Sequence, residues 1–264
     1  LLANTTGANN TAVGRSALGA NTTGSENVGV GVGALGANTT AANNVAVGVN
    51  TLLANTTGAN NTGLGRAALA ANTTASDNTA VGYFAGVAIT TGTSNNLIGS
   101  LSGDALTTGS FNQTLGVAAL SSDTTGNRSV AIGHGALLTQ NFTSSTDVYN
   151  IAIGHNAGLA VTTGTENTLI GGLAGDAITD ADFNVAVGKG ALGTNQLGSR
   201  NTAVGTNSLH IANPASAVNT YNTAFGYDAG YAVTTGIQNT LIGGLAGDAL
   251  LAAADNVAVG FEAL

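Results

Sequence analysis

The chain has 264 residues, of which 13 are acidic and 5 are basic, and its formal net charge is −8. The absence of a basic stripe argues against a nucleic-acid partner, and the absence of cysteine excludes disulfides and thiolate metal sites. Apolar residues make up 43% of the chain and 40 residues are glycine, with a single proline. This composition fits neither a disordered chain nor collagen, and no apolar run approaches the roughly 20 residues of a membrane span.

A glycine that ends a short apolar segment recurs through the whole chain, beginning with Thr11–Gly14. Twelve of the fourteen steps between successive glycines span 17 positions and two span 21. A fixed period is the signature of repeat architectures, so we expect one continuous all-β parallel β-solenoid of about 15 coils over residues 1–264. The anchor glycines are Gly14, Gly31, Gly48, Gly65, Gly82, Gly99, Gly116, Gly133, Gly154, Gly171, Gly188, Gly205, Gly226, Gly243 and Gly260.

The two longer steps occupy equivalent places in a larger repeat, in which 82–153 match 154–225. The additional residues lie within 138–150 and 210–222, and the second segment contains Pro214. We interpret both segments as loops that leave the wall of the solenoid.

The apolar segment before each anchor glycine reads as a short strand, as in Val185–Gly188. Alternate side chains of a strand point to opposite faces, and neither face is polar here. We expect Val185 and Val187 to face the interior of the coil, and Ala186 and Gly188 to face a neighbouring backbone. A 17-residue coil is too short to enclose a large core alone, so several chains around one axis, most simply three, are predicted.

Each coil also supplies one large apolar side chain from one of two neighbouring positions. Where the fourth residue after the anchor glycine is leucine, as at Leu18, the residue three further on is polar, as at Asn21. Where that fourth residue is glycine, as at Gly86, the later residue is apolar, as at Ile89. The pattern indicates a volume-conserving exchange in a packed core.

Two positions vary widely and are expected to face solvent. The residue after the anchor glycine is basic, aromatic or polar in many coils, and the residue five before it carries charges of both signs. The first column includes Arg15, Tyr83, Ser100, His134, His155, Lys189, Thr206, Tyr227 and Phe261, and the second includes Glu26, Asp77, Arg128, Glu166 and Arg200.

The segments Asn150–Gly154, Asn184–Gly188 and Asn256–Gly260 resemble the head repeats of trimeric autotransporter adhesins of the YadA type. The form Asn4–Gly14 is similar to repeats in phage tail fibres and related surface fibres. The resemblance covers essentially the whole chain and implies a left-handed, homotrimeric β-roll with a role in attachment. The period of this chain is longer than that of the usual adhesin head repeat.

The histidines and the repeated aspartates are candidate sites. His134 and His155 occupy equivalent positions on successive coils, where they are expected to stack; a surface metal site is the less favoured alternative. Asp104, Asp176 and Asp248 recur at equivalent places of the larger repeat, and we expect each to cap its own turn rather than to share an ion across a trimer. No catalytic, metal-binding or cofactor-binding residue is predicted, and the chain is not expected to be an enzyme.

A repeated Thr-Thr pair forms the most regular surface candidate. Because adjacent residues of an extended chain point in opposite directions, each pair offers one outward column rather than two. Ice or glycan binding by this column is an alternative to turn-stabilising hydroxyl ladders. Its candidate residues are Thr5, Thr22, Thr39, Thr56 and Thr73.

Repetition without a convergent polar site favours an extracellular structural or adhesive fibre on a cell surface, in a matrix or on a virion. Its predicted partners are further copies of the chain, as a homotrimer and head to tail, and a host or cell-surface receptor or glycan. Leu1 and Leu264 lie at one phase of the repeat, so the chain is expected to be a piece of a longer array. A phage tail-fibre shaft and a repetitive-surface binding module remain alternatives.

Overall fold

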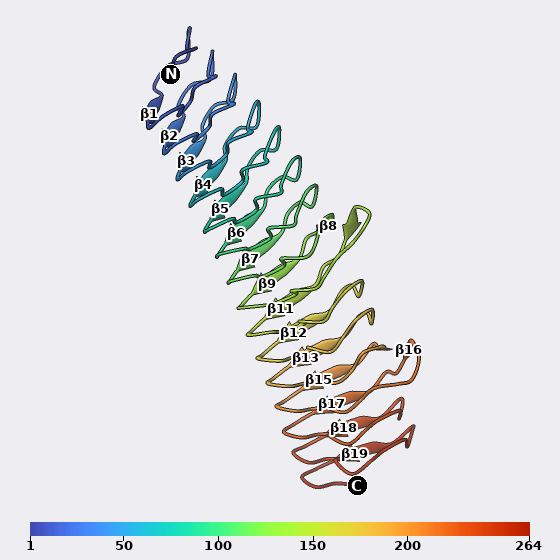
Figure 1. Ribbon diagram of the computed structural model, residues 1–264. Helices are drawn as coiled ribbons and strands as arrows, with labels where there is room; N and C mark the ends of the chain where they lie inside the picture. Colours follow the sequence, from blue (N-terminus) through green and yellow to red (C-terminus); the bar gives the residue numbers. More distant parts are fainter. The chain divides into compact units, whose positions relative to one another are not determined.

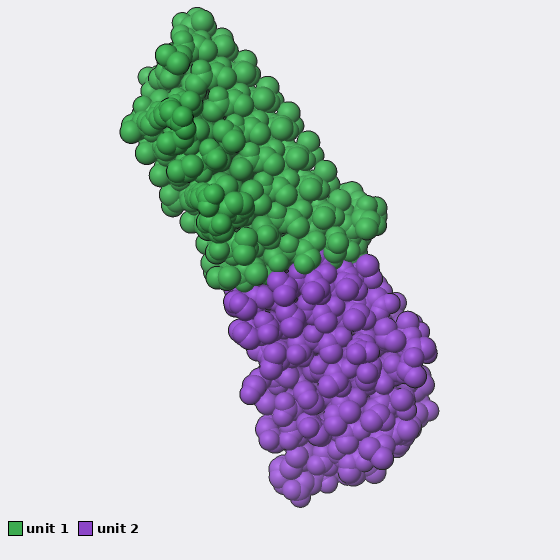
Figure 2. Space-filling model, in the orientation of Figure 1, with its two compact units in different colours: residues 1–128, 141–147 green, residues 129–140, 148–264 purple.

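The computed structural model describes residues 1–264 and contains strands and turns but no helix. Figure 1 shows a succession of short coils, most of which contribute one three-residue strand to a parallel sheet. The chain divides into two compact units, residues 1–128 with 141–147 and residues 129–140 with 148–264 (Figure 2). The predicted parallel β-solenoid of about 15 coils with a 17-residue period is confirmed.

In the first unit, successive coils pair in parallel with partner residues 17 positions apart, as Val28 pairs with Val45. The strands of its main sheet are β1 (Thr11–Val13), β2 (Val28–Val30), β3 (Val45–Val47), β4 (Thr62–Leu64), β5 (Thr79–Val81), β6 (Asn96–Ile98) and β7 (Gln113–Leu115). A separate pair joins β8 (Gly126–Asn127) to β10 (Thr146–Asp147).

The second unit repeats this arrangement, with partner residues 21 positions apart wherever a long loop intervenes, as Val130 pairs with Ile151. Its main strands are β9 (Val130–Ile132), β11 (Ile151–Ile153), β12 (Thr168–Ile170), β13 (Val185–Val187), β15 (Thr202–Val204), β17 (Thr223–Phe225), β18 (Thr240–Ile242) and β19 (Val257–Val259). Here β14 (Gly198–Ser199) pairs with β16 (Val218–Asn219).

The anchor glycines are required by the close stacking of the coils. Their φ angles run from +122° at Gly14 to +154° at Gly116, a region that is essentially restricted to glycine. A Cβ added at Gly14 would lie 2.7 Å from the carbonyl oxygen of Gly31 in the next coil. Any other side chain would therefore force neighbouring coils apart.

The predicted orientation of the strands is wrong. In β13, Ala186 is fully buried, while Val185 and Val187 are partly exposed. The same inside-out pattern holds in every main strand, where the middle residue is the least exposed and faces the interior of the coil. The reason lies in the core: a Cβ at Gly29, the middle residue of β2, would lie 3.4 Å from Cγ of Leu18. Where a leucine fills the interior, as Leu18 does beside Gly29, only a small middle residue fits; in β6 the inward middle residue is itself the fully buried Leu97.

The predicted exchange of core volume is confirmed. Leu18, Leu35, Leu52 and Leu69 are fully buried, and so are Ile89, Leu106, Val161, Ile178 and Val233 in coils of the other kind. At Gly86, an added Cβ would lie 3.2 Å from Cδ1 of Ile89 and 2.7 Å from Cδ1 of Leu97. Glycine at the fourth position after the anchor glycine therefore leaves space for two apolar side chains. One comes from the seventh position, as Ile89 does, and the other from the next strand, as Leu97 does.

The two long loops do more than leave the wall, because each folds back along the preceding coil. In the first, Asp123 Oδ1 accepts hydrogen bonds from the amides of Gly126 and Phe142, and Phe142 is largely buried. In the second, Pro214 packs against Gly198, where an added Cβ would lie 3.2 Å from Cδ of the proline. The short strands β10 and β16 are the result, and Figure 1 shows the two longest loops beside the labels β8 and β16.

Candidate interaction surface

The outward side of the main strands forms an uncovered apolar face. The residue just before each anchor glycine is aliphatic or phenylalanine in every coil, and none of these side chains is buried. The exposed fraction is 57% at Val13, 51% at Leu115 and 56% at Phe225. Parallel sheets are normally covered on both faces, so this uncovered column is a candidate interface.

The neighbouring column, two residues earlier in each strand, completes this face without adding any charge. It consists of valine, isoleucine, threonine, asparagine and glutamine, for example Val28, Thr62 and Gln113. Asn96 Nδ2 donates to Gln113 Oε1 at 2.7 Å, so even the amides satisfy one another along the column. We name these two columns together the apolar sheet face. An uncharged face with an aliphatic column that is not buried is a candidate interaction surface.

The Thr-Thr pairs behave as hydroxyl ladders. Thr22 Oγ1 donates to the carbonyl oxygen of Thr39 at 3.1 Å, and Thr39 Oγ1 donates to that of Thr56 at 3.1 Å. Each hydroxyl of the candidate column thus donates a hydrogen bond to a carbonyl oxygen of the next coil. The residues are Thr5, Thr22, Thr39, Thr56 and Thr73. The second threonine of each pair, such as Thr23 or Thr40, is the more exposed one.

His134 and His155 stack as expected, with ring centroids 5.3 Å apart and an angle of 10° between the planes. Both side chains are exposed on the column that follows the anchor glycines. No group of three or more histidine, aspartate or glutamate side chains is arranged to hold a metal ion. The third histidine, His210, lies within 2.7 Å of the carbonyl oxygen of Gly190 through Nδ1 and stacks on Tyr231.

Two of the three repeated aspartates, Asp104 and Asp176, have half-buried side chains with a raised pKa. Asp104 Oδ1 is inaccessible to solvent and has no hydrogen-bond partner, so this oxygen does not form the expected turn cap. Burial raises the pKa of Asp104, although its own backbone amide opposes the change. Burial also raises the pKa of Asp176, against the opposing effects of its own amide and of His210.

An internal asparagine ladder was not predicted from the sequence. The asparagine four residues before the anchor glycine is buried in most coils and connects neighbouring coils. Asn44 Oδ1 accepts from the amide of Asn61 at 2.9 Å, and Asn44 Nδ2 donates to the carbonyl oxygen of Gly58 at 2.9 Å. Its recurrence in every coil but that of Ser129 was the available signal.

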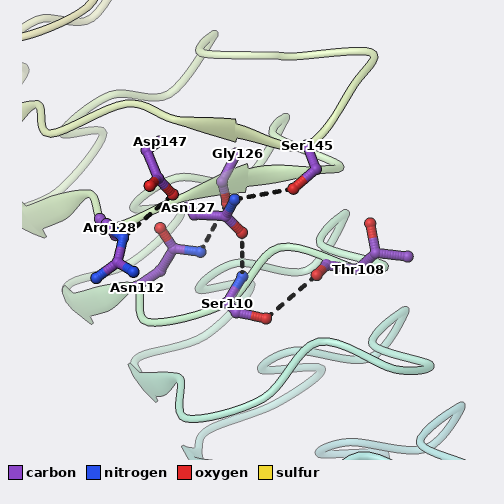
Figure 3. Close-up of polar contacts among 8 residues, drawn as sticks. All are labelled: Thr108, Ser110, Asn112, Gly126, Asn127, Arg128, Ser145 and Asp147. Carbon is purple, nitrogen blue, oxygen red and sulfur yellow. Dashed lines mark hydrogen bonds and ion pairs between the residues drawn. The ribbon is translucent and has the colours of Figure 1, made fainter.

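Each long loop also positions an arginine of the preceding coil. Arg128 Nε forms an ion pair with Asp147 Oδ1 at 3.1 Å, beside the hydrogen bond from Asn127 Nδ2 to Ser145 Oγ (Figure 3). At the equivalent place of the larger repeat, Arg200 Nε donates to Asn219 Oδ1 at 3.2 Å. Guanidinium groups also stack on rings, 4.9 Å from Arg128 to Phe111 and 4.4 Å from Arg200 to Phe183.

Comparison with protein-family models, curated proteins and solved structures gives no significant match for this chain. None of its elements is a helix with the length and apolar character needed to cross a membrane. The uncovered apolar sheet face is therefore the feature on which a functional assignment rests.

Proposed function

We propose that the chain is a structural segment of an extracellular fibre, in which copies associate through the apolar sheet face. The observation that carries this proposal is that the aliphatic or phenylalanine side chain just before the anchor glycine is partly or fully exposed in every coil. A column without a single charge over all coils gives a second copy a surface of uniform chemistry.

A homotrimer around one axis is the arrangement we favour. Three such sheets facing a common axis cover one another, and closed cyclic symmetry is the usual outcome for identical chains. The resemblance of Asn184–Gly188 to the head repeats of YadA-type adhesins supports the same arrangement, a left-handed coil and a role in attachment. A phage tail-fibre shaft uses the same assembly, and the flanking sequence distinguishes the two.

The test compares two double variants that differ only in the face they alter. Val30→Lys with Val47→Lys places two charges on the apolar sheet face, whereas Val32→Lys with Val49→Lys places them on exposed valines of the column after the anchor glycine. Light scattering after size-exclusion chromatography is expected to give a trimer for the wild type and the control, and a monomer for the first variant. A monomeric wild type, or equal effects of the two variants, would overturn the proposal.

Ice or glycan binding by the threonine column receives less support. The hydroxyl of the first threonine already donates to the next coil, as Thr22 does to Thr39. Only one column of free hydroxyls remains along a turn, which is narrower than the apolar sheet face. Thermal hysteresis that Thr23→Lys and Thr40→Lys abolish would favour this second function.

A further inference from the structure

The exposed column five residues before the anchor glycines changes character along the chain. Its backbone is left-handed in every coil, which suits asparagine and aspartate, and Asn43 and Asn60 occupy it in two early coils. Three successive coils of the second unit carry Phe183 (φ 58°), Arg200 (φ 65°) and Tyr221 (φ 51°), and the larger repeat has Phe111, Arg128 and Tyr149 at the equivalent places. These bulky residues gain little burial in return, since Phe183 is 39% and Tyr221 53% exposed. Aromatic and basic residues that stay exposed at such positions are candidates for a binding role.

Arg200 is held in place on one side of its guanidinium, and its terminal amino groups make no hydrogen bond. The group stacks 4.4 Å from the ring centroid of Phe183, and Nε donates to Asn219 Oδ1. Neither terminal amino group has a polar partner, and no carboxylate lies within ion-pair distance. A guanidinium that stacks on a ring keeps its in-plane N–H groups available for a planar carboxylate.

The equivalent arginine of the first unit differs in one decisive respect. Arg128 also stacks on a phenylalanine, Phe111, but its charge is compensated by Asp147. Asn219 stands in place of that aspartate at the equivalent position of the larger repeat, so the same scaffold supplies a hydrogen bond without neutralising the cation. The chain therefore contains a paired and an unpaired version of one site.

We propose that Arg200, oriented by Phe183 and Asn219, binds the carboxylate groups of an acidic polysaccharide. The site lies on an exposed column rather than in a pocket, which suits an extended polymer that passes across the coils. The exposed rings of Phe183 and Tyr221 offer apolar contact to the C–H groups of sugar rings beside the carboxylate. The isolated cation selects carboxylated over neutral sugar units.

The experiment uses the complete chain and immobilised polygalacturonate at low ionic strength, where screening is weak. Arg200→Asn removes the cation with a residue that the column tolerates elsewhere, and Arg128→Asn is its matched control. Asn219→Asp converts the second site into the paired form, and Asp147→Asn converts the first into the unpaired form. Fully methyl-esterified polygalacturonate serves as the neutral probe, and thermal unfolding by circular dichroism checks that each variant folds.

Arg200→Asn and Asn219→Asp are expected to weaken binding by up to about fivefold, the range of an exposed ion pair. Arg128→Asn is expected to leave binding unchanged and Asp147→Asn to strengthen it. The esterified polymer is expected to bind the wild type less tightly than polygalacturonate does, and to show no further loss with Arg200→Asn. Equal losses from Arg200→Asn and Arg128→Asn, or no effect of Asn219→Asp, would overturn the proposal. Stronger Arg200-dependent binding to polyglutamate than to polygalacturonate would overturn it in favour of an acidic peptide. These outcomes do not depend on the oligomeric state, so they are separable from the test of the fibre.

Discussion

A Cβ placed on Gly171 would lie 2.5 Å from the carbonyl oxygen of Gly188, directly in the path of the next coil. Its neighbour Gly172 has no such constraint, because the nearest atom to its added Cβ is the carbonyl oxygen of His155 at 4.0 Å. Of these two adjacent glycines, only Gly171 lies where a side chain would collide with the next coil.

Gly171→Ala is expected to lower the free energy of unfolding by at least about 1–3 kcal/mol, from backbone strain alone at a φ of +135°. Gly172→Ala is expected to change it by less than about 0.5 kcal/mol. Thermal unfolding followed by circular dichroism measures both. Similar melting temperatures for the two variants would contradict the stacking role of the anchor glycine.

Leu52 and Leu53 form a second adjacent pair with contrasting environments. Leu52 is fully buried, whereas Leu53 is 38% exposed. Leu52→Ala is expected to cost about 2–5 kcal/mol, since it leaves a cavity in a coil that has one large core side chain. Leu53→Ala serves as the control and should cost much less in the same denaturation experiment. A larger effect at Leu53 would show that the core is assigned to the wrong residue.

Asn44→Asp tests the internal asparagine ladder with an isosteric change. The substitution replaces a donor to the carbonyl oxygen of Gly58 with an acceptor and places a charge in a buried position. We expect a loss of about 1–3 kcal/mol or more at neutral pH, the cost of an unsatisfied buried group. Asn43→Asp, on the neighbouring exposed side chain, is expected to be nearly neutral. Equal unfolding temperatures would exclude a stabilising ladder.

Asp104 connects stability to pH. Because burial raises its pKa above the usual value of 3.8, the folded state binds this proton more tightly than the unfolded chain does. The resulting stabilisation is complete below the unfolded pKa and is lost as the pH rises through the folded pKa.

Asp104→Asn is therefore expected to raise the free energy of unfolding at neutral pH, by less than about 1 kcal/mol because the side chain is only half-buried. The gain should shrink as the pH falls toward 3.8. Melting temperatures between pH 3 and pH 8 measure the effect, and Asp255→Asn, at an exposed position, is the control. A gain that persists unchanged in acid would contradict the assignment to Asp104.

The sequence was sufficient for the features that depend on local geometry and on period. The regular recurrence of the anchor glycine established the coil length, because only glycine adopts the required backbone angle against the next coil. The alternation between Leu18 with Asn21 and Gly86 with Ile89 revealed the core, since a packed interior conserves volume from coil to coil.

Tertiary structure alone decided which side of each strand faces inward. Val185, Ala186 and Val187 are apolar on both sides of the strand, so alternation carries no direction. The choice is made by the volume left in the interior of the coils, which accepts a small residue such as Ala186 in most strands and a leucine such as Leu97 in a few. The valines are thereby turned outward to form the apolar sheet face.

The pairing of Arg128 with Asp147, and of Arg200 with Asn219, was likewise beyond the sequence. Each pair joins a coil to a residue of the following loop, 19 positions later, and no local pattern signals that the loop folds back. The larger repeat shows that the two places are equivalent. Only the folding of each loop against its coil, through β8 with β10 and β14 with β16, shows that one arginine has its charge compensated and the other does not.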